Sequence, residues 1–434
     1  MDKMADVLGR AGAWCGQNKY LSAIKNAFQN FMPLTIAGAI GVLWCNVLVN
    51  ESTGLGIFFK PIMALEFLNP AFQAVNFCTI SCITVGITLG IAQEIGVWNM
   101  GAEKAGYIPG LVGLAAWLSV TNTSHMVEGA KEAFTGIAGN ELGATGLFTG
   151  MIIGVLSVEL FCFFEKQDAL KIKMPEQVPP GVARAFEVLV PATITLIITA
   201  CIGSACYNLT GLYLNDVIKN GIQGPLGAVG ATIPGVMIIY LVIMLFWLVG
   251  IHGNNMLSAV KEALFTPLAL ENVEKFNKGE KPTNIINMYA LQMWGEFGGS
   301  GVTIGLVIAI MIFGKREDNK AIATLSLVKG LFNINETVTF GVPMVLNPIL
   351  GIPFVVAPLI TIIIGYVLTV IGFCPVACLT VPWTTPPIVF GFLACGANVM
   401  GAVTQAILIV VSTVIYTPFL ISYEKYQNKQ AAEA

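Results

Sequence analysis

Charged residues are scarce in this 434-residue chain: Asp, Glu, Lys and Arg make up 11% of it, against about 25% in an ordinary soluble domain. With 56% hydrophobic residues and a mean hydropathy of +0.78, the chain cannot cover a folded surface with polar groups. The uncharged runs 32–49 and 226–250 are long enough for single helices to cross the hydrocarbon core, which takes about 20 residues. The sequence therefore predicts an all-α polytopic membrane protein and excludes a soluble globular one.

Several other signatures are missing. The net charge of −3 provides no broad basic surface for nucleic acid, and neither GxxxxGK[ST] nor a GxGxxG after a strand is present for a nucleotide. The ten cysteines are scattered without a CxxC pair, so we expect small buried side chains instead of metal ligands. No hydrophobic segment typical of a signal peptide precedes residue 31, so no cleavable signal peptide is expected. We predict no metal, no cofactor and no soluble catalytic domain.

Apolar windows divide the chain into spans and connecting segments. Basic residues between Lys3 and Lys25 place the N-terminal segment on the cytoplasmic side, because Lys and Arg accumulate there. Four spans later, the basic, proline-containing linker 165–186 returns to that side and is the predicted boundary between two membrane domains, 1–164 and 187–434. The predicted spans are 31–50, 74–95, 106–120, 143–164, 187–208, 226–250, 298–314, 344–372 and 400–421.

The count of crossings fails in the second half of the chain. Two more spans bring it back inside near residue 251, where Lys261 and further lysines follow. One crossing at 298–314 would then leave Lys315 and Arg316 on the outside, against the preference of basic residues for the cytoplasm.

Two explanations of this failure are open. Either another segment within 282–297 crosses the membrane, or some segments enter it and return on the same side. Residues 251–300 and 330–398 mix Gly, Pro, Asn, Thr and Trp with short apolar runs. Irregular backbone lies at membrane depth only where protein buries it or where it lines a cavity. We therefore favour re-entrant segments over long surface loops.

The segment FNINETVTFGVP places a carboxylate, Glu336, between two apolar flanks. A charge at membrane depth is costly and by default marks a functional site. Asn333 and Asn335 can hold it by hydrogen bonds, and a carboxylate so placed suits a proton acceptor or a partner for a hydroxyl. The alternative is a helix-terminal carboxylate exposed at the membrane surface.

A second polar group of residues lies in GIHGNN, directly after a predicted span. His252 and the amide Asn254 stand there among glycines, as in a broken helix that lines a polar cavity. The chain has only one other histidine, His125, in what reads as an ordinary loop. A single histidine without a second ligand nearby argues against a metal site. The alternative is an interfacial histidine without a role.

Two tryptophans, Trp247 and Trp383, lie in or near polar turns. An aromatic face can stack on the apolar C–H face of a sugar while amides and carboxylates bind the hydroxyl groups. The alternative is anchoring at the membrane interface, where tryptophan is enriched. Together with the carboxylate, the imidazole and the amides, these rings predict a transporter of a small polar solute, with a sugar favoured.

Three motifs in this order resemble one known family: GIHGNN at 250–255, FNINETVTFG at 332–341 and NPILGIPF at 347–354. They are similar to the IIC membrane component of the phosphoenolpyruvate-dependent phosphotransferase system, lactose/cellobiose/diacetylchitobiose branch. The likeness extends over nearly the whole chain. The family often has proline after the glutamate, where this chain has Thr337.

The resemblance implies an architecture and a membrane. It implies about ten transmembrane helices with two re-entrant hairpins, usually in a homodimer. Residues 1–164 would form the dimerising scaffold and 187–434 the sugar-binding transport domain, joined by the linker 165–186. The location would be the bacterial cytoplasmic membrane, with both termini in the cytoplasm.

The resemblance also implies a chemistry. The chain would bind a β-linked disaccharide, and a phosphocysteine on a separate IIB protein, itself supplied by IIA, would phosphorylate the C6 hydroxyl. Glu336 and His252 would face that hydroxyl as the catalytic residues. The remaining residues implied at the substrate are Asn335, Asn254, Trp247, Trp383 and, for the distal ring, Asn140.

Two other functions compete with this interpretation. A proton-coupled secondary sugar transporter would use Glu336 as its proton carrier and would accumulate unmodified sugar. A membrane transferase with a lipid substrate would need a cluster of carboxylates for a divalent metal, and no DxxD pattern is present.

Overall fold

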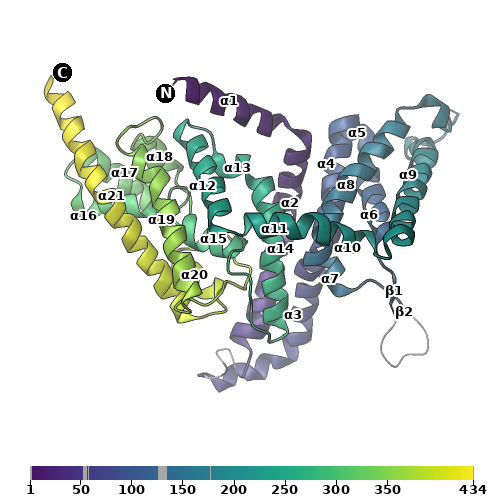
Figure 1. Ribbon diagram of the computed structural model, residues 1–434, viewed down its shortest axis with the longest axis horizontal. Helices are drawn as coiled ribbons and strands as arrows, with labels where there is room; N and C mark the ends of the chain where they lie inside the picture. The colour runs from purple at the N-terminus through teal and green to yellow at the C-terminus, as the bar shows by residue number, and fades with distance from the viewer. Residues whose placement is uncertain (1, 52–55, 57, 126–133, 176, 434) are drawn as a thin grey trace. The chain divides into compact units, whose positions relative to one another are not determined.

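The structure is a computed structural model that describes residues 2–51, 56, 58–125, 134–175 and 177–433. The regular secondary structure of these residues is helical (Figure 1), apart from a short antiparallel pair of strands, β1 (Ser124–His125) and β2 (Phe134–Thr135). The chain forms two compact units. Unit 1 comprises Met1–Gly16, Ala39–Gln73 and Val229–Ala434, and unit 2 comprises Gln17–Gly38 and Ala74–Ala228.

Unit 2 is built around α4, α6, α8 and α9, which pack on one another. Trp117 and its neighbours form a buried apolar cluster between them. Small residues let the helices approach closely: a side chain at Gly113 would collide with Ala92. The helices that lie wholly or mostly in unit 2 are α2 (Lys19–Leu43), α4 (Ile83–Met100), α5 (Ala102–Ala105), α6 (Ile108–Val120), α7 (Gly139–Leu142), α8 (Ala144–Glu165), α9 (Pro180–Thr210), α10 (Leu214–Ile218) and α11 (Gly224–Gly230).

Unit 1 packs α16 and α19 against the long α21, and α12 and α15 against α19. Its helices are α1 (Asp2–Gln17), α3 (Asn69–Asn76), α12 (Ile233–Leu248), α13 (Gly253–Met256), α14 (Ser258–Asn277), α15 (Met288–Gly295), α16 (Ile304–Phe313), α17 (Glu317–Leu331), α18 (Glu336–Gly341), α19 (Gly351–Val370), α20 (Val389–Ala394) and α21 (Val399–Glu433). Further helical turns are π-helical at Trp44–Leu48, Phe77–Ser81 and Lys219–Gln223, and 3₁₀-helical at Lys60–Leu68 and Asp168–Leu170.

Within the described part of the chain, five helices are long and apolar enough to cross a membrane, or six if the pair Lys60–Ser81 and Ile83–Met100, bent by 42°, forms one span. Each of the nine spans predicted from the sequence overlaps a helix of the structure. The predicted all-α, polytopic class is confirmed. The number of ten transmembrane helices and the two re-entrant hairpins stay predictions.

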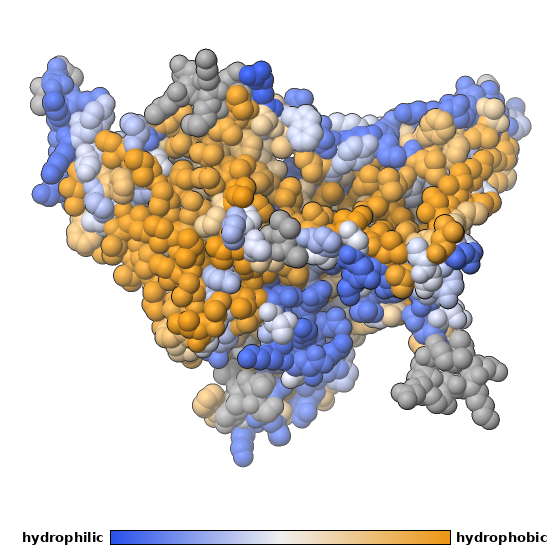
Figure 2. Space-filling view, in the orientation of Figure 1, coloured by the Kyte–Doolittle hydropathy of each residue, from blue (hydrophilic) through white to orange (hydrophobic). Residues whose placement is uncertain are grey.

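The outer faces of α19 and α21 are apolar. Figure 2 shows an apolar surface over these helices that gives way to hydrophilic residues at the C-terminal end of α21. Exposed side chains recur on α21 every three or four residues and so form a stripe along one face of the helix. The stripe consists of Val399, Val403, Ile407, Val410 and Val414. Because exposure of these apolar side chains to water is unfavourable, this face of α21 is suited to contact with lipid.

The division by packing differs from the predicted domain boundary at 165–186. α9, which follows that linker, packs on α6 and α8, so unit 2 continues to Ala228. At this contact Gly203 lies so close that a side chain there would come within 3.0 Å of Val120. Packing alone does not assign function, and the division into a scaffold and a transport domain stays a prediction.

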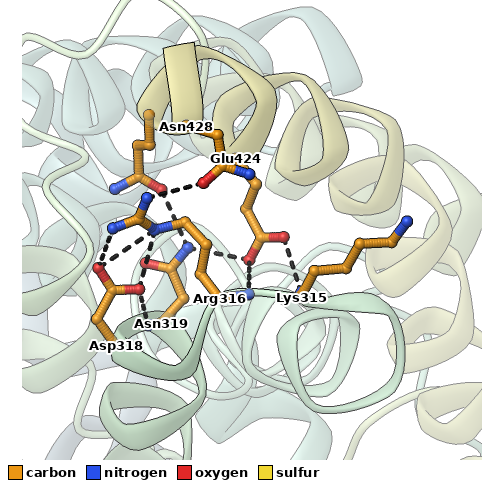
Figure 3. Close-up of polar contacts among 7 residues, drawn as sticks. Lys315, Arg316, Asp318, Asn319, Glu424 and Asn428 are labelled. Carbon is orange, nitrogen blue, oxygen red and sulfur yellow. Dashed lines mark hydrogen bonds and ion pairs between the residues drawn. The ribbon is translucent and has the colours of Figure 1, made fainter. Parts of the chain in front are cut away.

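A polar cluster ties the α16–α17 turn to the end of α21 (Figure 3). The buried carboxylate of Glu424 accepts hydrogen bonds from the backbone N–H of Lys315 at 2.8 Å and from Asn319 Nδ2 at 3.1 Å. Arg316 donates to Asp318, whose pKa this contact lowers, and to Asn428 Oδ1 at 2.9 Å. The basic turn therefore lies at the same end of unit 1 as the C-terminal end of α21.

We expect Glu424→Ala to lower the free energy of unfolding by ~1–3 kcal/mol, because buried donors lose their acceptor. Glu424 is 5% exposed and accepts from the N–H of Lys315 and from the amide of Asn319, which also donates to Gln427 Oε1 at 3.1 Å. Thermal unfolding in detergent measures the loss. The control is Glu433→Ala on the same helix, where the side chain is exposed and lies 3.8 Å from Lys429. Equal melting temperatures for the two variants would show that the polar cluster at Glu424 does not stabilise the fold.

Candidate functional site

The turn after α12 places His252. Gly250, at φ +82°, lets the chain reverse, and the backbone N–H of Gly250 donates to Trp247 O at 2.9 Å. The Nδ1 atom of His252 accepts a hydrogen bond from the N–H of Asn255 at 3.2 Å and caps α13. A side chain at Gly253 would collide with the carbonyl oxygen of Ile243, so the turn requires glycine there.

Residues 333–336, with the sequence Asn-Ile-Asn-Glu, are called the NINE segment here, and Glu336 is the first residue of α18. α17 ends at Leu331, and Asn333 then takes a left-handed conformation, φ +62°, which asparagine tolerates better than most residues. The side chain of Asn333 accepts from the N–H of Gly298 at 2.7 Å and donates to the carbonyl oxygen of Thr385 at 3.0 Å. Asn333 therefore joins the NINE segment to two loops that are distant in sequence.

Asn335 and Asn254 converge on one serine. The buried amide of Asn335 donates to Ser300 O at 2.8 Å, and Asn254 Nδ2 donates to Ser300 Oγ at 2.9 Å. Ser300 lies in a glycine-rich loop whose Gly299 has φ +88°. Both amide nitrogens are thus engaged in holding this loop between α13 and α18.

The structure brings His252 and Glu336 together. The Nε2 atom of His252 lies 3.9 Å from Glu336 Oε1, and the two side chains are 39% and 48% exposed. This distance is too long for a direct hydrogen bond. The two polar groups, 84 positions apart in the sequence, therefore face each other across a gap and keep free surface.

The two tryptophans differ in exposure. The Trp247 ring is 1% exposed and packs on His252, with ring centroids 4.4 Å apart, and on Phe354 at 6.4 Å. It supports the imidazole and has no free face for a ligand. Trp383 is 45% exposed and lies in the loop whose carbonyl groups bind Asn333. Of the two rings, only that of Trp383 is open to stacking.

Asn140 differs from the other predicted site residues. It lies exposed on α7 in unit 2, whereas His252, Glu336, Trp247 and Trp383 belong to unit 1. Among the residues that the structure describes, no group of three or more His, Cys, Asp or Glu side chains could hold a metal ion.

Sequence reasoning missed an ion pair beside the site. Lys261, which the count of crossings grouped with the basic residues on the cytoplasmic side, is 7% exposed and pairs with Glu296. The Tyr240 hydroxyl donates to Glu296 Oε1 at 2.7 Å. The signal was the isolated lysine in the apolar run SAVKEALF and the glutamate before the glycine-rich loop. Lysines in loops and lysines in buried pairs look alike in a sequence.

Known proteins match this chain over most of its length. The family model "Phosphotransferase system, EIIC" matches residues 25–358. The chain belongs to the phosphotransferase system EIIC family. The resemblance of the three motifs is confirmed, and the protein is a membrane permease component of that system.

Relatives in this EIIC family match over almost the full chain. The oligo-beta-mannoside-specific EIIC component of Bacillus subtilis (strain 168) is 32% identical over 98% of this chain and 94% of its own length. The cellobiose-specific EIIC component of Lactococcus lactis subsp. lactis (strain IL1403) is 29% identical over 98% of each chain. The crystal structure of the transporter ChbC, the IIC component from the N,N′-diacetylchitobiose-specific phosphotransferase system, has a TM-score of 0.88 at 29% identity and 97% coverage of both chains.

Thr337 fits this EIIC site without disturbing the turn. It is the second residue of α18, and its hydroxyl lies 3.1 Å from Lys329 Nζ, which donates to it. The first turn of a helix also accepts proline, because its N–H groups have no partner within the helix. Proline at position 337 would therefore not remove a hydrogen bond within α18.

Proposed function

We propose that this EIIC component binds a β-linked disaccharide of the cellobiose, diacetylchitobiose or lactose type and presents its C6 hydroxyl to a separate, phosphorylated IIB protein. The observation that carries the proposal is the gap of 3.9 Å between His252 Nε2 and Glu336 Oε1. One hydroxyl oxygen can lie about 2.8 Å from both atoms at once. Relatives named for cellobiose, oligo-beta-mannoside and diacetylchitobiose support the β-linked class.

The hydrogen bond at His252 Nδ1 supports a direction for each of the two hydrogen bonds to the substrate hydroxyl. Because His252 Nδ1 accepts from the N–H of Asn255, the neutral imidazole carries its proton on Nε2. Nε2–H then donates to the hydroxyl oxygen, and the hydroxyl donates its own proton to the carboxylate of Glu336. Glu336 is thus the general base, and His252 orients the oxygen for attack.

Phosphoryl transfer requires mainly that the acceptor hydroxyl lies in line with the phosphorus and the leaving group of the donor. The hydroxyl oxygen attacks the phosphorus of the phosphocysteine on IIB, the S–P bond breaks, and the hydroxyl proton passes to Glu336. The sugar phosphate that results carries added negative charge and no longer fits a site suited to an uncharged sugar. Transport and trapping are coupled in this way.

The other residues support the sugar. Trp383 offers its exposed ring to the sugar face, and Trp247 acts through His252, on which it packs. Asn254 and Asn335 shape the site through Ser300. Asn140, in unit 2, is assigned to the distal ring by family likeness alone.

The wider setting belongs to the same proposal. IIA supplies phosphate to IIB, and the permease works as a homodimer in the bacterial cytoplasmic membrane with both termini inside. Residues 1–164 serve as the dimerising scaffold, 165–186 as a cytoplasmic linker and 187–434 as the transport domain. Basic residues of the N-terminal segment and of the linker support this orientation.

Proteoliposomes loaded with phosphorylated IIB test the function. We expect labelled cellobiose, diacetylchitobiose or lactose to appear inside as sugar phosphate, in proportion to the phospho-IIB supplied and without response to an uncoupler. Accumulation of unmodified sugar that collapses with the uncoupler would instead identify a proton-coupled transporter and refute the proposal.

We expect Trp383→Ala to weaken sugar binding about tenfold. Stacking of an aromatic ring in a desolvated site is worth about 1 kcal/mol or more, and 1.4 kcal/mol is tenfold. Titration calorimetry with the transported disaccharide measures the change, and Trp383→Phe should retain most of the affinity. The control is Trp98→Ala on α4, in unit 2, where the side chain is also exposed (57%, against 45% for Trp383). Equal affinities for the two alanine variants would exclude stacking on Trp383.

A further inference from the structure

An ion pair lies buried beside the hydroxyl site. Lys261 on α14 and Glu296, directly after α15, have side chains only 7% and 17% exposed. The hydroxyl of Tyr240 donates to Glu296 at 2.7 Å, and Lys261 Nζ lies 5.5 Å from the centre of the Tyr240 ring. Burying such a pair costs desolvation, and apolar residues of similar volume often stabilise a fold equally well. Stability alone therefore does not explain why a pair is present here.

A continuous series of contacts runs from the pair to both groups that face the hydroxyl. Lys261 Nζ donates to Asn254 Oδ1 at 3.3 Å, and Asn254 Nδ2 donates to Ser300 Oγ at 2.9 Å. Asn335 Nδ2 donates to the carbonyl oxygen of the same serine at 2.8 Å. Asn254 is two residues from His252, and Asn335 is adjacent to Glu336.

The lysine decides which way the amide of Asn254 points. A cation attracts the amide oxygen and repels the amide nitrogen, so Oδ1 turns to Lys261 and Nδ2 is left for Ser300. Glu296 in turn holds Lys261 in its place. Without the cation the Asn254 amide can rotate by about half a turn and exchange the positions of Oδ1 and Nδ2. Asn254 is then no longer restricted to the role of donor toward the hydroxyl of Ser300.

We propose that Lys261 and Glu296 are positioning residues, which fix the Asn254 amide and, through Ser300, hold His252 and Glu336 at the separation that accepts a sugar hydroxyl. This inference rests on the proposed function. The pair does not touch the reacting atoms. Its effect is geometric, and a misplacement of about 1 Å can cost about 100-fold in rate.

The test compares Lys261→Met/Glu296→Leu, which replaces the pair with apolar residues, with Lys261→Arg, which keeps a cation. We expect the double variant to fold, to bind disaccharide within about threefold of the parent, and to lose about 10- to 100-fold in the maximal rate of phosphorylation by phospho-IIB. Lys261→Arg should recover most of that rate. A folded double variant with the parent's rate would overturn the proposal.

A further variant separates positioning from direct binding. Glu296→Gln keeps the shape of the side chain and weakens the hold on Lys261, so the proposal expects the maximal rate to fall more than the affinity. A loss of sugar affinity with Glu296→Gln that is absent in Lys261→Arg would make Glu296 a sugar ligand. That outcome would overturn the positioning role.

A second readout needs no phosphoryl transfer. The chain has only two histidines, so in a His125→Gln background the imidazole NMR signals report on His252 alone. Glu336→Gln should move these signals in the parent and move them much less in the double variant, where the two groups are no longer held together. Equal displacement in both would refute positioning. The parent protein could make no sugar phosphate while the movement of the His252 signals still depends on the Lys261–Glu296 pair. In that case the proposed function fails and the positioning role stands.

Discussion

Glu336→Gln will lower the rate of sugar-phosphate formation about 1000-fold while sugar binding stays measurable. A positioned general base contributes about 100- to 10,000-fold to a proton transfer, and an amide cannot take the proton of the C6 hydroxyl. The amide oxygen can still accept a hydrogen bond from that hydroxyl, so the site keeps its shape. The side chain is 48% exposed, which leaves room for the substitution without repacking.

The experiment needs two measurements on one preparation. Phosphorylation is followed with excess phospho-IIB, and affinity is measured by titration calorimetry with the same disaccharide. Glu317→Gln on α17 is the control, because that carboxylate is 88% exposed and pairs only with Lys320 at its surface among the contacts described. Phosphoryl transfer at the parent's rate in the Glu336 variant would remove the carboxylate from the chemistry.

Much of the fold follows from the sequence because lipid leaves few options for the backbone. Every polar backbone group at membrane depth needs a partner within the protein, so long apolar runs become helices. This is why each predicted span overlaps a helix. The same argument says little about where a helix breaks, as the 42° bend before Ile83 illustrates.

The site was only partly predictable. Glu336 and His252 stood out because polar side chains in apolar surroundings are rare. Their approach to 3.9 Å depends on Ser300 and Asn333, which join segments that are distant in the sequence. No local pattern encodes such a junction. The pairing of Lys261 with Glu296 was not predicted, because hydropathy records the presence of a charge, whereas burial depends on a partner in another segment.

Gly299→Ala will disrupt the sugar site, because the added methyl group collides with Asn335, the neighbour of Glu336. Gly299 has φ +88°, and a Cβ there would lie 2.7 Å from both Cβ and Cγ of Asn335. The strain of a non-glycine residue in this conformation is about 1–3 kcal/mol before any collision is counted. Relief of the collision must displace either the loop or the NINE segment. We expect sugar affinity to fall about 30-fold or more, as measured by titration calorimetry.

Gly279→Ala provides the matched control. Gly279 also has a left-handed conformation, φ +73°, but no atom lies within 4 Å of the position its Cβ would take. It therefore shows the cost of the backbone conformation alone, as a fall in melting temperature without loss of sugar affinity. Equal affinities for the two variants would show that the contact of Gly299 with Asn335 does not matter for the site.

The collision partner can be identified by a double substitution. Asn335→Ala removes Cγ and Oδ1, which are two of the three atoms nearest to the added methyl group. It also removes the hydrogen bond to Ser300, so it weakens the site by itself. Because residues in contact do not add independently, Gly299→Ala/Asn335→Ala should lose less affinity than the sum of the two single variants. Strict additivity would place the strain in the loop backbone or at the Cβ of residue 335, which alanine retains 2.7 Å from the added methyl group.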